Sequence, residues 1–221
     1  MKLYAHPFSS YCQKVLIALY ENDVPFDYLN LEAATVKAEL ASLWPLKRFP
    51  VLVDQGRTLI ESSTIIEYLQ CAHPGPHCLV PAGEDGIEVH MLDRLFDNYV
   101  MTPMQALTAA LLQPASDAGG ATTAAARATL LNSYALLDRQ VDGRRWLAGE
   151  AFTLADCAAA PALFYAVAYV PVPDAHAALS AYVERLMAHT AVAAVIDAAR
   201  PWFKHFPGRA GLARRYYDPD A

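Results

Sequence analysis

The sequence predicts two unlike parts, a mixed α/β domain followed by an all-α helical bundle. Strand and helix patterns alternate over the first 80 residues, whereas the rest of the chain shows helical patterns alone. Alanine marks the same division, because 33 of the 41 alanines follow residue 100. Residues 72–84 between the parts are rich in proline and glycine, which do not continue a helix. We therefore expect one domain at residues 1–78 and a second at 84–221.

The first part is expected to have the order β-α-β-α-β-β-α. Its first helix is predicted by apolar residues at helical spacing, and its second ends at Trp44-Pro45, because the residue before proline disfavours helical geometry. A turn at Gln55-Gly56 separates the last two strands. The predicted strands cover residues 2–5, 26–31, 51–54 and 58–60, and the predicted helices cover 11–22, 34–43 and 62–70. This order gives a small mixed sheet with helices on its faces.

The second part is predicted to be a bundle of helices. The expected helices cover residues 86–112, 122–141, 154–168, 176–188 and 191–200. Alanine-rich helices approach one another closely, so a tight bundle is expected.

Composition excludes several classes of protein. The chain has 221 residues, of which 55% are hydrophobic and 18% charged, so long disorder is not expected. A net charge of −6 without a basic run argues against nucleic acid as a partner. Apolar residues 157–172 are too few to span a bilayer and contain two prolines, and no signal peptide is expected before the first strand. Four cysteines do not form a disulfide scaffold at this length, and we expect a cytoplasmic protein in a reducing compartment.

Two serines, Ser9 and Ser10, lie in the loop that leads from the first strand into the first helix. A helix N-terminus presents unpaired N–H groups and a partial positive charge, which stabilise an anion such as a thiolate. The alternative is that either serine only caps the helix, a position where serine is common.

Two further segments suggest a binding site. Phe49-Pro50 precedes a short strand, and a cis proline there would leave the Phe49 backbone free to pair with an extended ligand; an ordinary trans proline is the alternative. Glu61 and Ser62 lie where a strand meets a helix N-terminus, a combination that suits the ammonium and carboxylate of an amino acid. The alternative for Glu61 and Ser62 is that they only cap the helix that follows, which explains these residues equally well.

Taken in order, these segments resemble the glutathione S-transferase superfamily over nearly the whole chain. The resemblance rests on the serine loop, the block FPVLVD…LIESSTIIEYL, the following helical half, and Thr153 with Asp156, which match the family's capping motif. It implies a thioredoxin-like first domain that binds glutathione as co-substrate, and a helical domain that completes a pocket for a small electrophile. It also implies a homodimer that acts in detoxification by conjugating glutathione.

The resemblance assigns roles to single residues. Thioredoxin-like relatives place C-x-x-C in the first loop, which aligns Ser9 with the first cysteine and Cys12 with the second. We therefore expect Ser9 to stabilise the glutathione thiolate, with Ser10 as the second choice, and a shielded Cys12. The chain is similar to the serine-type and in particular the zeta-class enzymes. A glutathione-dependent isomerase or reductase, or a non-catalytic binding or assembly protein, are the alternatives.

The remaining contacts follow from the same resemblance. Phe49 and a cis Pro50 are expected to meet the cysteinyl unit, Glu61 and Ser62 the γ-glutamyl end, and Lys47 or Arg48 the glycine carboxylate.

Other residues offer weaker signals. Phe8, Tyr99 and Met104 are candidates for the electrophile pocket, although Met and aromatic residues at helical spacing are more often core. The segment 71–78 holds two cysteines and two histidines, but it lacks the C-x₂₋₄-C spacing of a zinc site, so no metal is expected.

Overall fold

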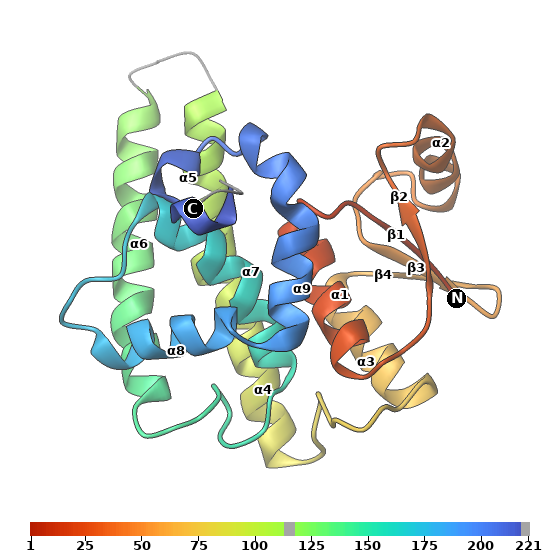
Figure 1. Cartoon of the computed structure of the whole chain (residues 1–221), viewed down its shortest axis with the longest axis horizontal. Helices are drawn as coiled ribbons and strands as arrows, with labels where there is room; N and C mark the ends of the chain where they lie inside the picture. Colours follow the sequence, from red (N-terminus) through yellow and green to blue (C-terminus); the bar gives the residue numbers. More distant parts are fainter. Residues whose placement is uncertain (113–117, 218–221) are drawn as a thin grey trace.

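The computed structural model describes residues 1–112 and 118–217, and its first part has the predicted order β-α-β-α-β-β-α (Figure 1). The elements are β1 (Lys2–Ala5), α1 (Ser10–Glu21), β2 (Asp27–Asn30), α2 (Ala34–Leu43), β3 (Val51–Asp54), β4 (Arg57–Ile60) and α3 (Ser62–Ala72). The strands form one mixed sheet in the order β2-β1-β3-β4, in which β1 is parallel to β2 and antiparallel to β3. Gln55 and Gly56, both with positive φ, close the β3–β4 hairpin.

Alternating side chains of β1 give the sheet two buried faces. Leu3 and Ala5 belong to the main apolar core, which also contains the buried residues of α1 and α3. Tyr4 points the other way, into a smaller cluster with Leu40 of α2. Helices α1 and α3 therefore lie between the sheet and the helical part of the molecule, and α2 lies at the far side (Figure 1).

The second part consists of helices in the described residues. They are α4 (Glu84–Leu95), a π-helical segment η1 (Phe96–Met101), α5 (Thr102–Leu112), α6 (Ala118–Val141), α7 (Leu154–Tyr169), α8 (Ala177–Met187) and α9 (Thr190–Ala199), followed by short 3₁₀ segments η2 (Arg200–His205), η3 (Arg209–Gly211) and η4 (Arg214–Tyr216). The all-α prediction for this part is confirmed. The sequence patterns did not reveal the 3₁₀ segments.

Residues 84–112 are helical throughout, as the prediction of a helix over residues 86–112 expects, but the middle of this helix is the π-helical segment η1. The N–H of Thr102 donates to the carbonyl of Asp97, five residues earlier, instead of the usual four. Pro103 gives the physical reason, since it has no N–H to donate to the carbonyl of Tyr99. The hydroxyl of Ser133 in α6 donates to that carbonyl instead, at 3.0 Å.

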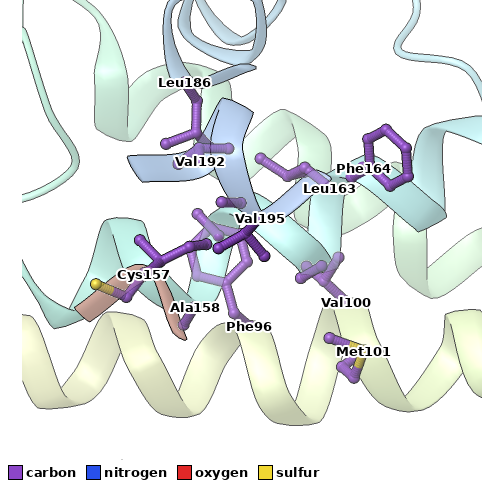
Figure 2. Close-up of a cluster of buried hydrophobic side chains, with 14 of the residues drawn as sticks. Phe96, Val100, Met101, Cys157, Ala158, Leu163, Phe164, Leu186, Val192 and Val195 are labelled. Atoms are coloured by element: carbon purple, nitrogen blue, oxygen red, sulfur yellow. The ribbon is translucent and has the colours of Figure 1, made fainter. Parts of the chain in front are cut away.

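Helix α7 is the centre of the helical part. Almost all of its residues are buried, as expected for a helix that is apolar on every side. It contacts α1, α4, η1, α5 and α8, and its Cys157, Ala158, Leu163 and Phe164 lie among side chains from η1 and α9 (Figure 2). The small residues Ala158–Ala160 allow these helices to come close.

Asp156, in the first turn of α7, anchors this helix to the segment before it. Its carboxylate accepts the N–H of Thr153 at 2.9 Å and the N–H of Leu147 at 3.1 Å. It also accepts the hydroxyl of Tyr182 in α8 at 2.7 Å. The carboxylate is buried, so these donors replace the water that it would otherwise bind.

Asp156→Ala is expected to lower the free energy of unfolding by about 3 kcal/mol or more, because it leaves several buried donors without an acceptor. For a chain of this length the melting temperature should fall by about 6–12 °C. Asp142→Ala is the matched control, because Asp142 is exposed. Equal melting temperatures for the two variants would contradict the anchoring role of Asp156.

Candidate functional site

A cavity of about 610 Å³ lies between the first domain and the helical wall made by α4, η1 and α5. Its volume is within the range of small-molecule sites, roughly 300–1,000 Å³. The N-terminal ends of α1 and α3 both reach it, through Ser9 and through Glu61 with Ser62. The full lining comprises Ser9, Tyr11, Trp44, Lys47, Arg48, Phe49, Pro50, Glu61, Ser62, Arg94, Asp97, Asn98, Thr102 and Gln105.

Ser9 is the N-cap of α1 and lines the cavity. Its Oγ accepts the N–H of Cys12 at 3.4 Å, so the capping alternative is realised. Capping uses only an oxygen lone pair, and in the described residues the Ser9 hydroxyl donates to no acceptor. The proton of Ser9 therefore remains available to an anion in the cavity.

Two buried side chains hold the loop that carries Ser9. The amide of Gln13 donates to the carbonyl of Pro7 at 2.8 Å, and the hydroxyl of Tyr165 in α7 donates to the carbonyl of Phe8 at 3.1 Å. Gln13 and Tyr165 are themselves hydrogen-bonded at 3.0 Å. The helical part thus fixes the loop from behind, and Ser9 has a defined position at the cavity.

The loop before β3 forms one side of the cavity. The Phe49–Pro50 peptide bond is cis, as predicted. No hydrogen bond within residues 1–112 and 118–217 engages the N–H or C=O of Phe49, so both are free to pair with an extended ligand. Lys47 and Arg48 are exposed beside it and bring two positive charges to the same rim.

Glu61 has an unusual backbone conformation where β4 meets α3. Its φ of 65° lies in the left-handed region, which costs a non-glycine residue of order 1–3 kcal/mol. Lys47, also on the cavity, has a φ of 54°. Such strain persists where the surroundings enforce it, and it is frequent at ligand sites. Ser62 follows at the first position of α3 and is buried at the cavity floor.

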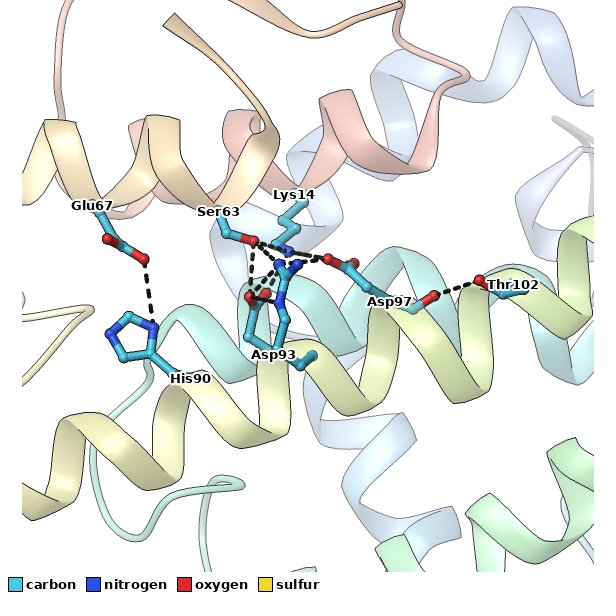
Figure 3. A network of polar contacts seen from close by, with 8 residues as sticks. Lys14, Ser63, Glu67, His90, Asp93, Asp97 and Thr102 are labelled. Carbon is cyan, nitrogen blue, oxygen red and sulfur yellow. Dashed lines mark hydrogen bonds and ion pairs between the residues drawn. The ribbon is translucent and has the colours of Figure 1, made fainter.

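A buried polar network joins this site to the helical wall (Figure 3). The ammonium of Lys14 in α1 has only 2% of its side chain exposed; it pairs with Asp93, contacts Asp97 at 3.3 Å and donates to Ser63 at 2.9 Å. Arg94 donates to Ser63 and Asp93, and to Asp97 at 2.8 Å. Four helical segments, α1 and α3 of the first part and α4 and η1 of the second, therefore meet in one ion cluster.

The cluster controls the protonation of its carboxyl groups. Burial favours the neutral form of Asp93, but the Lys14 ammonium and the hydrogen bonds from Arg94 and Ser63 together outweigh it and hold the pKa of Asp93 below its ordinary value. Burial raises the pKa of Asp97, and Lys14 only partly opposes this. Burial, with a further contribution from Asp97, raises the pKa of Tyr11 to about 12, so the phenol on the cavity stays protonated at neutral pH.

Cys12 has no access to the cavity. It is fully buried, and burial raises the pKa of its thiol to about 12. The expected shielding of Cys12 is confirmed. A thiol in this state does not supply a thiolate nucleophile.

Two family models match the chain. The glutathione S-transferase N-terminal domain matches residues 3–77, and the glutathione S-transferase C-terminal domain matches residues 99–190. The chain belongs to the glutathione S-transferase superfamily. Its sheet with flanking helices is the thioredoxin-like domain of that superfamily, and its second part is the all-helical domain.

Three known proteins are similar over most of this chain. A stringent starvation protein A homolog of Coxiella burnetii is 29% identical over 173 residues, covering 74% of this chain and 75% of the relative. A glutathione S-transferase of Pseudomonas putida is 28% identical over 156 residues, covering 71% and 70%. The solved glutathione S-transferase of Methylobacillus flagellatus KT with GSH bound covers 88% of this chain and 98% of its own, with a TM-score of 0.73 and 23% identity.

In this glutathione S-transferase family member, the structure brings together most of the residues expected at the site. Seven of them line the cavity: Ser9, Lys47, Arg48, Phe49, Pro50, Glu61 and Ser62. Ser10 does not line it, because it is buried in the first turn of α1.

The three residues expected in the electrophile pocket lie outside the cavity lining. Phe8 packs edge-on against Tyr165, Phe203 and Phe206 in the core. Met104 is buried in the bundle, and Tyr99 is 57% exposed. These placements correct the expectation of an apolar pocket wall built from Phe8, Tyr99 and Met104.

The polar wall of this family member was missed by the sequence analysis. It consists of Arg94, Asp97, Asn98, Thr102 and Gln105. Arg94, Asn98, Thr102 and Gln105 are spaced by three or four residues along one helical segment, which is a usable signal for a shared face. Tyr11 and Trp44 also line the cavity, and no comparable sequence pattern indicated them.

Two features of the described residues bear on other functions. Residues 1–112 and 118–217 contain no group of three or more His, Cys, Asp or Glu side chains placed to hold a metal ion. Over the same ranges, no single helix has both the length and the apolar composition to cross a bilayer.

Lys14→Met is expected to lower the free energy of unfolding by about 3–5 kcal/mol, because it leaves the buried Asp93 carboxylate without its ammonium partner. Lys14→Met combined with Asp93→Leu should recover much of that loss, since no uncompensated charge then remains at this pair. Denaturant unfolding measures both, with the exposed Lys37→Met as control. If Lys14→Met were no less stable than Lys37→Met, a stabilising role for the Lys14–Asp93 pair would be contradicted.

Proposed function

We propose that the protein binds glutathione in the 610 Å³ cavity and conjugates its thiolate to small electrophiles. The observation that carries the proposal is that two helix N-termini meet at one cavity, one with the free hydroxyl of Ser9 and the other with Glu61 and Ser62. Membership of the superfamily and the similarity to a GSH-bound structure support it.

Each part of the tripeptide has a complementary part of the cavity. Glu61 pairs with the ammonium of the γ-glutamyl unit, and Ser62 with the α3 N-terminus holds its carboxylate. The free N–H and C=O of Phe49 pair with the cysteinyl unit, which directs the sulfur toward Ser9. Lys47 or Arg48 pairs with the glycine carboxylate.

Ser9 acts on the ionisation of the thiol. A free thiol has a pKa near 8.5 and is mostly protonated at neutral pH, whereas the thiolate is the nucleophile. A hydrogen bond from the Ser9 hydroxyl and the positive end of α1 both favour the charged form. The thiolate sulfur then attacks the electrophile, and the electron pair of the broken bond leaves with the departing group or moves into the acceptor.

Reduction of disulfides is disfavoured as an alternative, because the position of an attacking thiol holds Ser9 and Cys12 is buried. A non-catalytic role is the second candidate. Similarity to a stringent starvation protein A homolog over 74% of the chain favours it, since that protein is not named as a transferase.

Ser9→Ala is expected to raise the apparent pKa of conjugation and to lower the rate near neutral pH roughly ten- to a hundredfold, because a charge-assisted hydrogen bond worth ~1.5–3 kcal/mol is lost. Glutathione affinity should change much less, because the other contacts remain. The measurements are pH–rate profiles with a generic aromatic electrophile and titration calorimetry with glutathione.

Ser10→Ala is the matched control and should leave the pH profile near that of the wild type, because Ser10 does not reach the cavity. A larger effect at Ser10 would reassign the thiolate donor. Glutathione binding without turnover of any electrophile would establish the non-catalytic role, and no binding at millimolar glutathione would reject the proposal.

We also propose that the protein acts as a cytoplasmic homodimer in detoxification. Ile87 and Met91 of α4 and Tyr99 of η1 are large apolar residues with 68%, 57% and 57% of each residue exposed. Exposed apolar residues that gather on one face mark a surface that a partner covers. The superfamily resemblance favours a second copy of this chain as that partner.

The dimer is expected to dissociate when Ile87→Lys and Met91→Lys are combined, because burying two ammonium groups in an apolar interface is costly. Sedimentation velocity at micromolar concentration measures the change in mass. A wild-type monomer under the same conditions would contradict the homodimer.

A further inference from the structure

The two walls of the cavity differ in chemistry. All of its apolar or aromatic lining residues, Tyr11, Trp44, Phe49 and Pro50, come from the first domain, where glutathione is proposed to bind. The opposite wall, formed by α4, η1 and α5, contributes polar side chains alone: Arg94, Asp97, Asn98, Thr102 and Gln105. A co-substrate that lies between glutathione and this wall therefore meets hydrogen-bonding groups.

The polar residues at the far end of the wall share one helix face. Thr102 lies four residues after Asn98 and three residues before Gln105, a spacing that places the three on the same side of a helix. All three line the cavity, whereas Met101 and Met104 are buried in the bundle.

The wall has two ends with different partners. Arg94 and Asp97 are bonded to the cluster around Ser63, next to Ser62, and so lie near the end proposed for the γ-glutamyl unit. Gln105 lies roughly 15 Å further along the segment at ordinary helical rise. The far end of the wall is therefore beyond the γ-glutamyl site and available to a second substrate.

Hydrogen-bonding capacity at this far end is unused. Within residues 1–112 and 118–217, the side-chain amides of Asn98 and Gln105 make no hydrogen bond or ion pair. The Thr102 hydroxyl donates to the carbonyl of Asp97 at 2.9 Å and keeps its own lone pairs. An apolar co-substrate would cover these amides without replacing their bonds to water, which is unfavourable.

We infer that the co-substrate of this site is a small polar electrophile whose reactive carbon is activated by an amide or carboxyl-type carbonyl, held by Asn98, Thr102 and Gln105. The inference rests on the proposed glutathione conjugation and names its substrate class. In the reaction, the thiolate sulfur bonds to the β-carbon of an unsaturated carbonyl compound. The C=C electron pair moves toward the carbonyl oxygen, which accepts hydrogen bonds from the amides, and the α-carbon takes a proton from water.

The test compares two S-substituted glutathiones that differ only in polarity at the wall. One is the adduct of glutathione with acrylamide; the other is S-isopentyl glutathione, which has the same shape without hydrogen-bonding atoms. Titration calorimetry is expected to show that the acrylamide adduct binds roughly tenfold more tightly, as two ordinary hydrogen bonds would give. The readout does not require turnover.

Two single variants assign the preference to the wall. Asn98→Leu and Gln105→Leu should each reduce the ratio of the two affinities severalfold while leaving unsubstituted glutathione binding within about twofold. Asn132→Leu makes the same change at an exposed amide on α6, outside the cavity, and should leave the ratio unchanged.

The outcomes separate this inference from the function on which it rests. Equal or tighter binding of the isopentyl derivative would overturn the polar co-substrate while leaving glutathione binding intact. A preference for the acrylamide adduct that neither Leu variant reduces would also overturn it. Failure of glutathione and both derivatives to bind would reject the proposed function itself.

Discussion

The buried ammonium of Lys14 is the interaction on which the arrangement of the site depends. A charge with 2% of its side chain exposed is tolerated only where fixed partners replace water. Those partners come from elsewhere in the chain: Asp93 and Asp97 from the helical wall and Ser63 from α3. Because Ser9 precedes α1 and Ser62 begins α3, satisfying this one charge also sets both helix N-termini against the wall, and the space between them is the cavity.

A second constraint acts through Pro103. The missing N–H leaves the Tyr99 carbonyl to the hydroxyl of Ser133, and the chain accommodates the proline by widening the preceding turn. The helix continues past this turn, so Asn98 of η1 and Thr102 and Gln105 of α5 line the same wall of the cavity. The proline therefore changes one turn of the helix without interrupting the wall.

The fold and half of the site could be predicted from the sequence, because their signals are local. Alternation, helical spacing and turn residues identify β1 to α3, and Ser9, Phe49 and Glu61 stand next to the element ends that expose them. The rest depends on contacts between distant residues. The sequence around Lys14 does not distinguish it from a surface lysine. Its burial follows only from the fold, in which α4 places Asp93 beside it. Helical spacing alone does not distinguish a core face from a pocket face, and Met104 lies on the core face.

Ser9 and Cys12 lie near the same end of α1, but Ser9 lines the cavity and Cys12 is buried. Both lie within a turn of the positive end of α1, which favours an anion by up to about 2 kcal/mol. At Cys12 burial exceeds this effect, and the pKa of the thiol rises to about 12.

A ligand thiol outside the helix, beside the half-buried Ser9, avoids that cost and gains a hydrogen bond of ~1.5–3 kcal/mol. At ~1.4 kcal/mol per pKa unit, the hydrogen bond alone lowers a thiol pKa of 8.5 by about one to two units. The environment beside Ser9 therefore favours a thiolate on the bound substrate, whereas the thiol of Cys12 stays protonated.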